Sequence, residues 1–475
     1  MPKSTSSPPA AKISRRPELP ELSGAERQEL GRSRRELLPR AAHAEWSPAP
    51  NRDVLALLQA SNQGRVPELV PIRHTCMLAS PFTFYRGAPA VMAYDLGQMP
   101  STGLYSQLCG DCHIGNFGMY ASPERTLVFD LNDFDETLPG PFEWDVKRTA
   151  ASIVVAARSA GISPKDAEEA VGVAVRVYRE KMREFAERSY LDTWYSEVTG
   201  GVFLQMVDKA DRKTTKAGLA RAQARNQQYA LGKLTAVVDG KRGFVHNPPY
   251  VFRLSKAEGD VRTWVTDLFT AYHASLEDSR KTLLARYRLM DVAHKVAGVG
   301  SVGTRCFISY WQGSDARDAL FLQLKQANAS LLEPYLGRSE YEHPGRRVVT
   351  GQRLMQATSD IFLGYTRSGG DDYFVRQLYD AKGSVDLEDI PAAYLARYAG
   401  LCGAVLARAH ARTGDPAQIG GYLGKSDRFD KALVHFASAY ADQNDADYAV
   451  FRQAVAEGKL PTLAAEPEQK SRRQK

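Results

Sequence analysis

One short region of the chain gathers side chains that could handle phosphate and a metal ion. It runs from "CGDCHIGNFG" to "DLNDFDE" and holds Asp111, His113, Asn116, Asp130, Asp133 and Asp135. Apolar residues such as Phe129 and Phe134 lie between them and would hold the carboxylates against a folded body. Phosphoryl transfer needs a carboxylate beside the attacking hydroxyl, and oxygen ligands that hold magnesium on the nucleotide phosphates. We therefore expect phosphoryl-transfer chemistry in this region.

The spacing within this region suggests a role for each residue. In kinase catalytic loops the base Asp precedes a metal-binding Asn by about five positions, and a second metal-binding Asp follows downstream. Asp111 matches the position of the base, and Asn116 matches the position of the first metal ligand. Asp130 follows an apolar pair, at the expected separation for the second ligand, whereas Asp133 precedes a phenylalanine as in Asp-Phe-Gly. The sequence favours Asp130 on spacing and leaves Asp133 as its rival.

A second group of residues, much later in the chain, is suited to binding nucleotide phosphates. It comprises Gly298, Gly300, Ser301 and Gly303 from "GVGSVG", and Lys325 from "LFLQLKQ". Glycines between two strands let the backbone approach phosphates, and a lysine on the following strand can neutralise them. Glu333 is the nearest acidic candidate to pair with Lys325. The alternative is a glycine-rich hairpin without a ligand, with the lysine facing water.

Composition limits the class of protein. The chain has 475 residues, of which 43% are hydrophobic and 25% charged, as expected for a globular protein with two lobes or more. The net charge of +7 is mild, and no basic stripe with interleaved aromatics indicates nucleic-acid binding. The five cysteines indicate a reducing compartment, and no apolar run reaches the length of a membrane span. We expect a cytoplasmic protein.

Hydrophobic periodicity predicts helices first, strands next and helices again. Helices are expected over 140–161, 163–190, 388–414 and 427–456, and strands within 295–313, 318–327, 346–354 and 372–382. We expect a disordered or peripheral tail over 1–45, a helical lobe with the catalytic loop over 46–290, a strand-rich nucleotide-binding lobe over 291–385, C-terminal helices over 386–460 and a solvated basic tail over 461–475.

Several segments together resemble a bacterial family known as domain of unknown function 2252. They include "SPFTFYRG", "CGDCHIGNFG", "LVFDLNDFDETLPGPFEWDVKR", "GVGSVGTR" and "YFVRQLYDAKGS". That family name supplies no activity. The acidic region also resembles the aminoglycoside and choline phosphotransferases, in which HGDxHxxN precedes an apolar segment with Asp; here Cys109 replaces the first His. That resemblance implies that Asp145 supports the loop rather than the chemistry.

Together these features predict an α+β fold of the kinase-like two-lobe type. The catalytic loop precedes the glycine-rich stretch, the reverse of ordinary kinases, so we expect a circular permutation. The expected function is transfer of phosphate from ATP, with Mg²⁺, to an unidentified small-molecule or protein acceptor. Two alternatives stay open: a metal-dependent phosphoesterase, and a catalytically silent nucleotide-binding protein.

Overall fold

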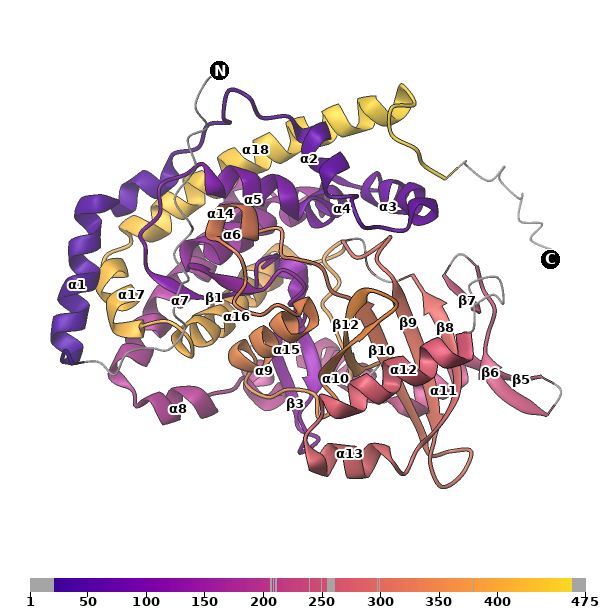
Figure 1. Cartoon of the computed structure of the whole chain (residues 1–475). Coiled ribbons are helices and arrows are strands. Elements are labelled where there is room, and N and C mark those ends of the chain that lie inside the picture. Colours follow the sequence, from indigo (N-terminus) through magenta and orange to yellow (C-terminus); the bar gives the residue numbers. More distant parts are fainter. Residues whose placement is uncertain are drawn as a thin grey trace, which may run out of the picture.

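The chain folds into a helical body joined to an antiparallel sheet, an α+β architecture (Figure 1). The computed structural model describes residues 21–463 except 206, 208, 210, 211, 239, 249, 254–260, 297, 299 and 379. The main helices of the body are α6 (Glu143–Ser159), α7 (Pro164–Glu187), α16 (Ala392–Ala411), α17 (Pro416–Leu423) and α18 (Arg428–Ala456). No helix within the described residues is long and apolar enough to cross a membrane.

The large sheet has six strands in the order β11-β12-β10-β9-β8-β7, with antiparallel neighbours throughout. Their bounds are β7 (Val251–Arg253), β8 (Arg288–Lys295), β9 (Cys306–Gln312), β10 (Ala319–Gln326), β11 (Gly364–Ser368) and β12 (Asp371–Gln377). The strands predicted within 295–313, 318–327 and 372–382 are therefore present.

Side-chain alternation divides β10 between the two faces of this sheet. Leu322 and Leu324 pack in the cluster that contains Phe269 of α12 (Val261–Ala274), whereas Phe321 packs in another with Leu231 of α11 (Gln227–Leu234). Lys325 has the same parity as Phe321, so the lysine leaves the sheet on the face opposite α12.

Two pairs of short antiparallel strands connect the body to the region of interest. β1 (Tyr105–Leu108) pairs with β4 (Leu138–Pro141), and β2 (Phe117–Ala121) pairs with β3 (Leu127–Leu131). The second pair is a hairpin, in which Phe117 lies opposite Leu131. The residues just before β2 and just after β3 therefore lie at the same end of the hairpin.

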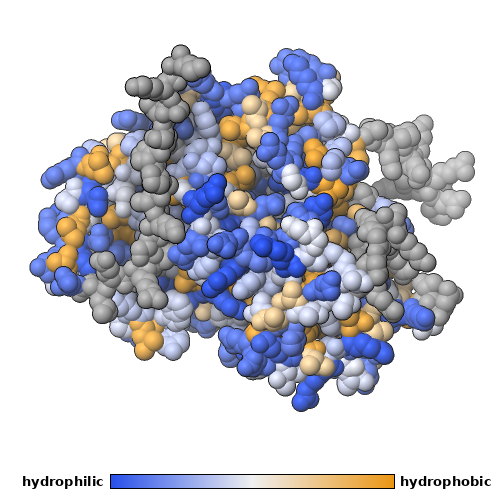
Figure 2. All heavy atoms as spheres, in the orientation of Figure 1, coloured by the Kyte–Doolittle hydropathy of each residue, from blue (hydrophilic) through white to orange (hydrophobic). Residues whose placement is uncertain are grey.

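The segment 346–354, predicted as a strand, is instead part of the helix α15 (Pro344–Met355). Its buried residues include Gly345, Val348, Val349, Gln352 and Met355, the spacing of one helix face, and Arg346 and Arg353 are exposed. The adjacent valines suggested a strand, but Pro344 in the first turn and this spacing favour the helix. Figure 2 shows hydrophilic side chains in the centre of the view, where Figure 1 places α15.

Within the segment 1–45, predicted to be a disordered or peripheral tail, residues 24–44 are not disordered. They form α1 (Gly24–Leu37) and the short helix η1 (Arg40–Ala44), and α1 packs against α17 (Figure 1). Arg35 donates to the carbonyls of Gly421 and Tyr422 at 2.5 and 2.8 Å, at the end of α17. Basic residues that suggested a solvated tail therefore satisfy carbonyls at a helix end. Residues 1–20, and 464–475 of the C-terminal tail, lie outside the described residues.

The predicted boundary between lobes at 290/291 also falls too late. β7, β8, α11 and α12 begin before residue 291 and all belong to the sheet or pack on it. The segment 46–290, predicted as a helical lobe, therefore includes β7 and the start of β8 of the large sheet. The reason is that α12 looks like any amphipathic helix in sequence, and only its packing partner assigns it to the sheet.

The buried lysine Lys147 on α6 leads to a prediction on stability. Its Nζ lies 4.5 Å from the centre of the Phe436 ring. Burial lowers the pKa of Lys147 to about 8, and the charge of Glu143 partly opposes this shift. Between about pH 8 and 10.5 the unfolded chain would hold a proton that the folded chain has lost, so the free energy of unfolding should rise with pH in this window, by about 3 kcal/mol. In Lys147→Met this rise should be absent.

Urea unfolding across this pH range measures the effect of Lys147. The control is Lys431→Met, which removes an exposed lysine of α18 that pairs with Asp427. The control should retain the pH dependence of the wild type. Identical pH profiles for wild type and Lys147→Met would contradict the prediction.

Candidate active site

The acidic residues gather at one end of the β2–β3 hairpin. Residues 109–116 lead into β2 and residues 132–136 follow β3, and the amide of Asn132 donates to the carbonyl of Asn116 at 2.9 Å. We call these two segments the acidic loop. Asp111, Asn116 and Asp133 thus lie at the same end of the β2–β3 hairpin.

Asp145, near the start of α6, holds the first segment of the acidic loop in place. Its buried carboxylate accepts hydrogen bonds from the amides of Cys109 at 2.6 Å and Gly110 at 3.0 Å. His410 of α16 lies 3.3 Å from the same carboxylate. Gly110 has a φ of +88°, and a Cβ there would lie 2.4 Å from the carbonyl oxygen of Glu136, so only glycine fits. Asp145 therefore holds the backbone of the loop at Cys109 and Gly110.

Asp111 is held by a buried arginine. Arg148 of α6 donates to Asp111 Oδ1 through Nε at 2.7 Å and Nη2 at 2.6 Å. The guanidinium lies 4.2 Å from the centre of the Tyr85 ring, and its Nη2 donates to the Tyr85 carbonyl at 3.0 Å. The other carboxylate oxygen, Oδ2, lies 4.0 Å from His113 Nε2. The Asp111 side chain is 21% exposed, so a ligand can reach this oriented carboxylate.

Asn116 is fixed by its amide nitrogen. Nδ2 donates to the carbonyl of Asp111 at 2.9 Å, and it also lies 3.9 Å from the Cys109 sulfur. These contacts orient the side chain so that its Oδ1 is the atom left for a ligand. The side chain of Asn116 is thus held by the backbone of Asp111.

Asp130 lies in a different environment. Its carboxylate is 1% exposed, accepts from Arg408 Nη2 at 2.6 Å, and also accepts from the amides of Leu131 at 2.9 Å and Ala357 at 2.8 Å. Both of its oxygens are therefore occupied by donors within the protein. This is the arrangement of a buried structural ion pair.

Asp133 and Asp135 lie beside Lys325. Lys325 Nζ is 3.7 Å from Asp133 Oδ2 and forms a closer ion pair with Asp135. The Asp133 side chain is 37% exposed and that of Lys325 only 5% exposed, so the carboxylate is the more accessible of the two groups. A buried Asp135 oxygen, Oδ1, has no partner within the described residues.

The charges of this group influence one another. Desolvation alone would raise the pKa of Asp133, but the positive charges of Lys325 and Arg376 outweigh it and lower that pKa. Desolvation and the charge of Asp133 raise the pKa of Asp135 to about 6. For Lys325, burial is outweighed by the two carboxylates, which raise its pKa. Asp133 and Lys325 are therefore charged at neutral pH.

The glycine-rich segment 298–303 connects β8 to β9 and lies against the N-terminal part of the chain. The amide of Val66 donates to the Gly303 carbonyl at 2.7 Å, and Arg65 Nη1 donates to the Val302 carbonyl at 2.5 Å. Gly303 has a φ of +96°. Within the turn, the Ser301 carbonyl accepts from the amide of Thr304 at 3.1 Å.

The last predicted site residue, Glu333, is not brought to Lys325. It opens the short helix α14 (Glu333–Leu336), where its Oε1 accepts from the amide of Ser330 at 3.3 Å. The lysine has Asp133 and Asp135 as partners instead. Asp135 and Arg148 were missed as site residues. The signals were an Asp-Phe-Asp alternation and a Lys-Arg pair just before the apolar run of a buried helix.

The acidic loop offers oxygen atoms of the kind that bind magnesium. Mg²⁺ is usually bound by one or two carboxylates together with substrate phosphates and waters. Asp133 and Asn116 offer such oxygens, and the unpartnered Asp135 Oδ1 is a further buried acceptor. Within the described residues there is no group of three or more His, Cys, Asp and Glu side chains arranged as a metal site.

Comparison with protein families assigns the chain. The family described as "uncharacterized protein conserved in bacteria", DUF2252, matches residues 65–454. The chain belongs to this family. The DUF2252 match covers the acidic loop, the glycine-rich segment and Lys325, and it begins at Arg65, which contacts that segment. Comparison with curated proteins gives no match, and comparison with solved structures gives none either.

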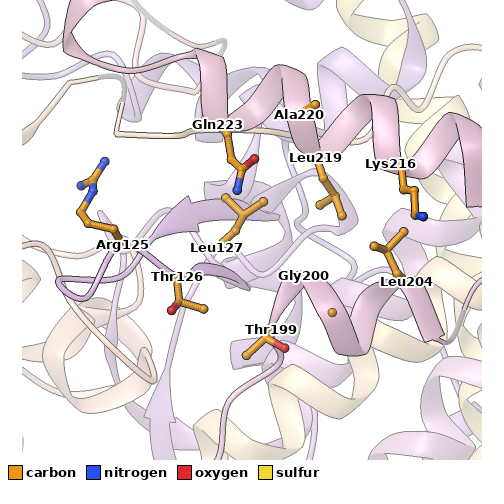
Figure 3. Close-up of a pocket in the computed structure, with 11 residues that line it drawn as sticks. Arg125, Thr126, Leu127, Thr199, Gly200, Leu204, Lys216, Leu219, Ala220 and Gln223 are labelled. Atoms are coloured by element: carbon orange, nitrogen blue, oxygen red, sulfur yellow. The ribbon is translucent and has the colours of Figure 1, made fainter.

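A cavity of about 530 Å³ lies elsewhere, between the β2–β3 hairpin, α9 (Gly200–Gln205) and α10 (Arg212–Ala224) (Figure 3). Arg125, Thr126 and Leu127 line it from the turn of the hairpin. That turn is the end of the hairpin opposite the acidic loop. The described residues that line this cavity include no carboxylate.

Proposed function

We propose that this protein is a magnesium-dependent phosphotransferase that transfers the γ-phosphoryl group of ATP to the hydroxyl of a small-molecule or protein acceptor in the cytoplasm. The observation that carries the proposal is the ion pair of Lys325 with Asp133 and Asp135. It joins the sheet of the glycine-rich segment to the acidic loop, although these stretches lie far apart in the sequence. A kinase needs the same conjunction of a strand lysine, a glycine-rich loop and a metal-binding Asp.

The strand order supports a kinase-like fold. If β8 and β9, which flank the glycine-rich segment, are the first two strands, Lys325 lies on the third, the strand that carries the nucleotide lysine in protein kinases.

The end of α16 supports a circular permutation. Thr413, just beyond this helix, accepts from the amide of Gln107 in β1 at 3.0 Å. A chain joined between these two points would run from the sheet through α16 into the acidic loop, the usual kinase order.

Each residue then has a chemical task. Bound Mg²⁺ would neutralise phosphate charge, held by Asn116 and Asp133. Lys325 would bind phosphate oxygens, and the glycine-rich segment would cover them. Asp111 Oδ2 would accept the proton of the acceptor hydroxyl, because Arg148 holds the other oxygen. The acceptor oxygen forms a bond to the γ-phosphorus while the bond to the bridging oxygen breaks, and ADP leaves with that electron pair.

A thermal-shift screen tests the proposal. ATP with Mg²⁺ should raise the unfolding temperature, because a ligand at about one hundred times its Kd adds about 2.7 kcal/mol to the stability of the folded state. Stabilisation should be weaker without Mg²⁺. Stabilisation without any loss of γ-phosphate across a panel of hydroxyl acceptors would instead favour a silent nucleotide-binding protein. No response to any nucleotide, combined with hydrolysis of a phosphate ester, would favour a phosphoesterase.

A further inference from the structure

Two arginines from the N-terminal part of the chain face the acidic loop, and they are bonded very differently. Arg65 is engaged, with Nε donating to the Ser61 carbonyl at 2.9 Å and Nη1 to the Val302 carbonyl at 2.5 Å. Arg86, in α4 (Pro81–Gly87), forms no hydrogen bond or ion pair with any residue that the structure describes. Its Nε is buried and lacks a partner. Arg65 therefore holds the glycine-rich segment, whereas Arg86 is left with unused donors.

Contacts place Arg86 between the glycine-rich segment and Asp111. A Cβ on Gly300 would lie 3.2 Å from the Arg86 carbonyl oxygen, so this segment passes directly over α4. The guanidinium carbon is 5.8 Å from the centre of the Phe82 ring, and that ring packs edge-on against His113, with centroids 6.3 Å apart. His113 in turn lies 4.0 Å from Asp111. These contacts connect the glycine-rich segment to Asp111 through Arg86, Phe82 and His113.

The charges around Arg86 also indicate that it could bind an anionic ligand. Burial lowers the pKa of Arg86, and the negative charges of Asp111 and Asp133 oppose that shift. Arg148 already bonds Asp111, and Lys325 already pairs with Asp133, so each carboxylate has its own cation. The Nε of Arg86 is buried without an acceptor, which costs free energy unless a ligand supplies one. Its planar fork matches the oxygens of a phosphoryl group.

We propose that Arg86 binds the γ-phosphoryl group of ATP and stabilises it during transfer from ADP to the acceptor. This inference rests on the proposed function, because it assumes that Asp111 and Asp133 flank the transferred group. In some nucleotide hydrolases, an arginine of the enzyme itself stabilises the negative charge of the transferred phosphoryl group in the transition state. Arg86 would bind oxygens that ATP has and ADP lacks.

Affinities for the magnesium complexes of ATP and ADP, measured by titration calorimetry, test this role. Arg86→Met should weaken ATP binding by about 10- to 100-fold, the range of a charged hydrogen-bond pair, and leave ADP affinity close to that of the wild type. Arg86→Lys should recover part of the ATP affinity. The unliganded variant should unfold near the wild-type temperature, because Arg86 has no bonded partner to lose.

The matched control is Arg452→Met. Arg452 is exposed on α18, and its guanidinium carbon also lies 5.8 Å from a ring centre, that of Tyr448. This variant should bind both nucleotides as the wild type does. A wild type that binds both nucleotides, with Arg86→Met weakening both equally or neither, would overturn the role of Arg86 alone. A wild type that binds neither nucleotide would overturn the proposed function and this role with it.

Discussion

Asp111→Asn should lower turnover by about 10²- to 10⁴-fold, the usual contribution of a positioned general base, and leave affinity for Mg²⁺ and ATP nearly unchanged. The amide is close in size to the carboxylate but cannot take the acceptor proton. Asp111 lies outside the proposed metal ligands, so nucleotide affinity should survive. Steady-state transfer rates and calorimetric ATP affinities, compared with the wild type, separate the two effects.

The control for Asp111 is Asp133→Asn, which removes a proposed metal ligand. It should weaken nucleotide binding and raise the Mg²⁺ concentration needed for half-maximal activity, which Asp111→Asn should not. Unchanged turnover in Asp111→Asn would remove Asp111 from the mechanism. A loss of ATP affinity equal to the loss of rate would assign Asp111 to binding rather than to proton transfer.

Arg408→Met should lower the free energy of unfolding by about 3–5 kcal/mol, as expected when one partner of a buried ion pair is removed. Arg408 and Asp130 are 3% and 1% exposed in their side chains, so the carboxylate would stay buried without its cation. Urea unfolding at neutral pH measures the change. The control, Arg158→Met, removes a surface arginine paired with Asp442 and Asp445, and it should cost about 1 kcal/mol or less.

Substitutions at Asp130 and Asp133 decide between the two candidate metal ligands. Asp130→Asn should destabilise the fold while the folded fraction keeps its requirement for Mg²⁺. Asp133→Asn should destabilise the fold less than Asp130→Asn, because Asp135 still pairs with Lys325, and it should alter that requirement. If Asp130→Asn removed the Mg²⁺ dependence of nucleotide binding without loss of stability, Asp130 would be the ligand, and our assignment to Asp133 would be wrong.

Local pattern was sufficient for the four long helices α6, α7, α16 and α18 and for three strands of the large sheet, β9, β10 and β12. α7 begins at Ser163 with Pro164 in its first turn, as the sequence indicates, and Ser163 caps it through its side chain. The hairpin around the glycine-rich segment and the strand with Lys325 follow from runs of apolar residues bounded by glycine and Asp. Local pattern failed at α15, where two adjacent valines suggested a strand but the burial repeats with the period of a helix.

The sequence by itself determined which side chains could take part: Asp111 and Asn116 at loop spacing, two further Asp residues, a glycine-rich turn and a strand lysine. Only the tertiary structure decided their partners. Arg408, far along the chain, occupies Asp130, while Lys325 instead of Glu333 pairs beside Asp133. Arg86 stays unbonded beneath the glycine-rich segment. The reason is physical, because desolvation and ion pairing depend on contacts between residues distant in sequence, which no local pattern encodes.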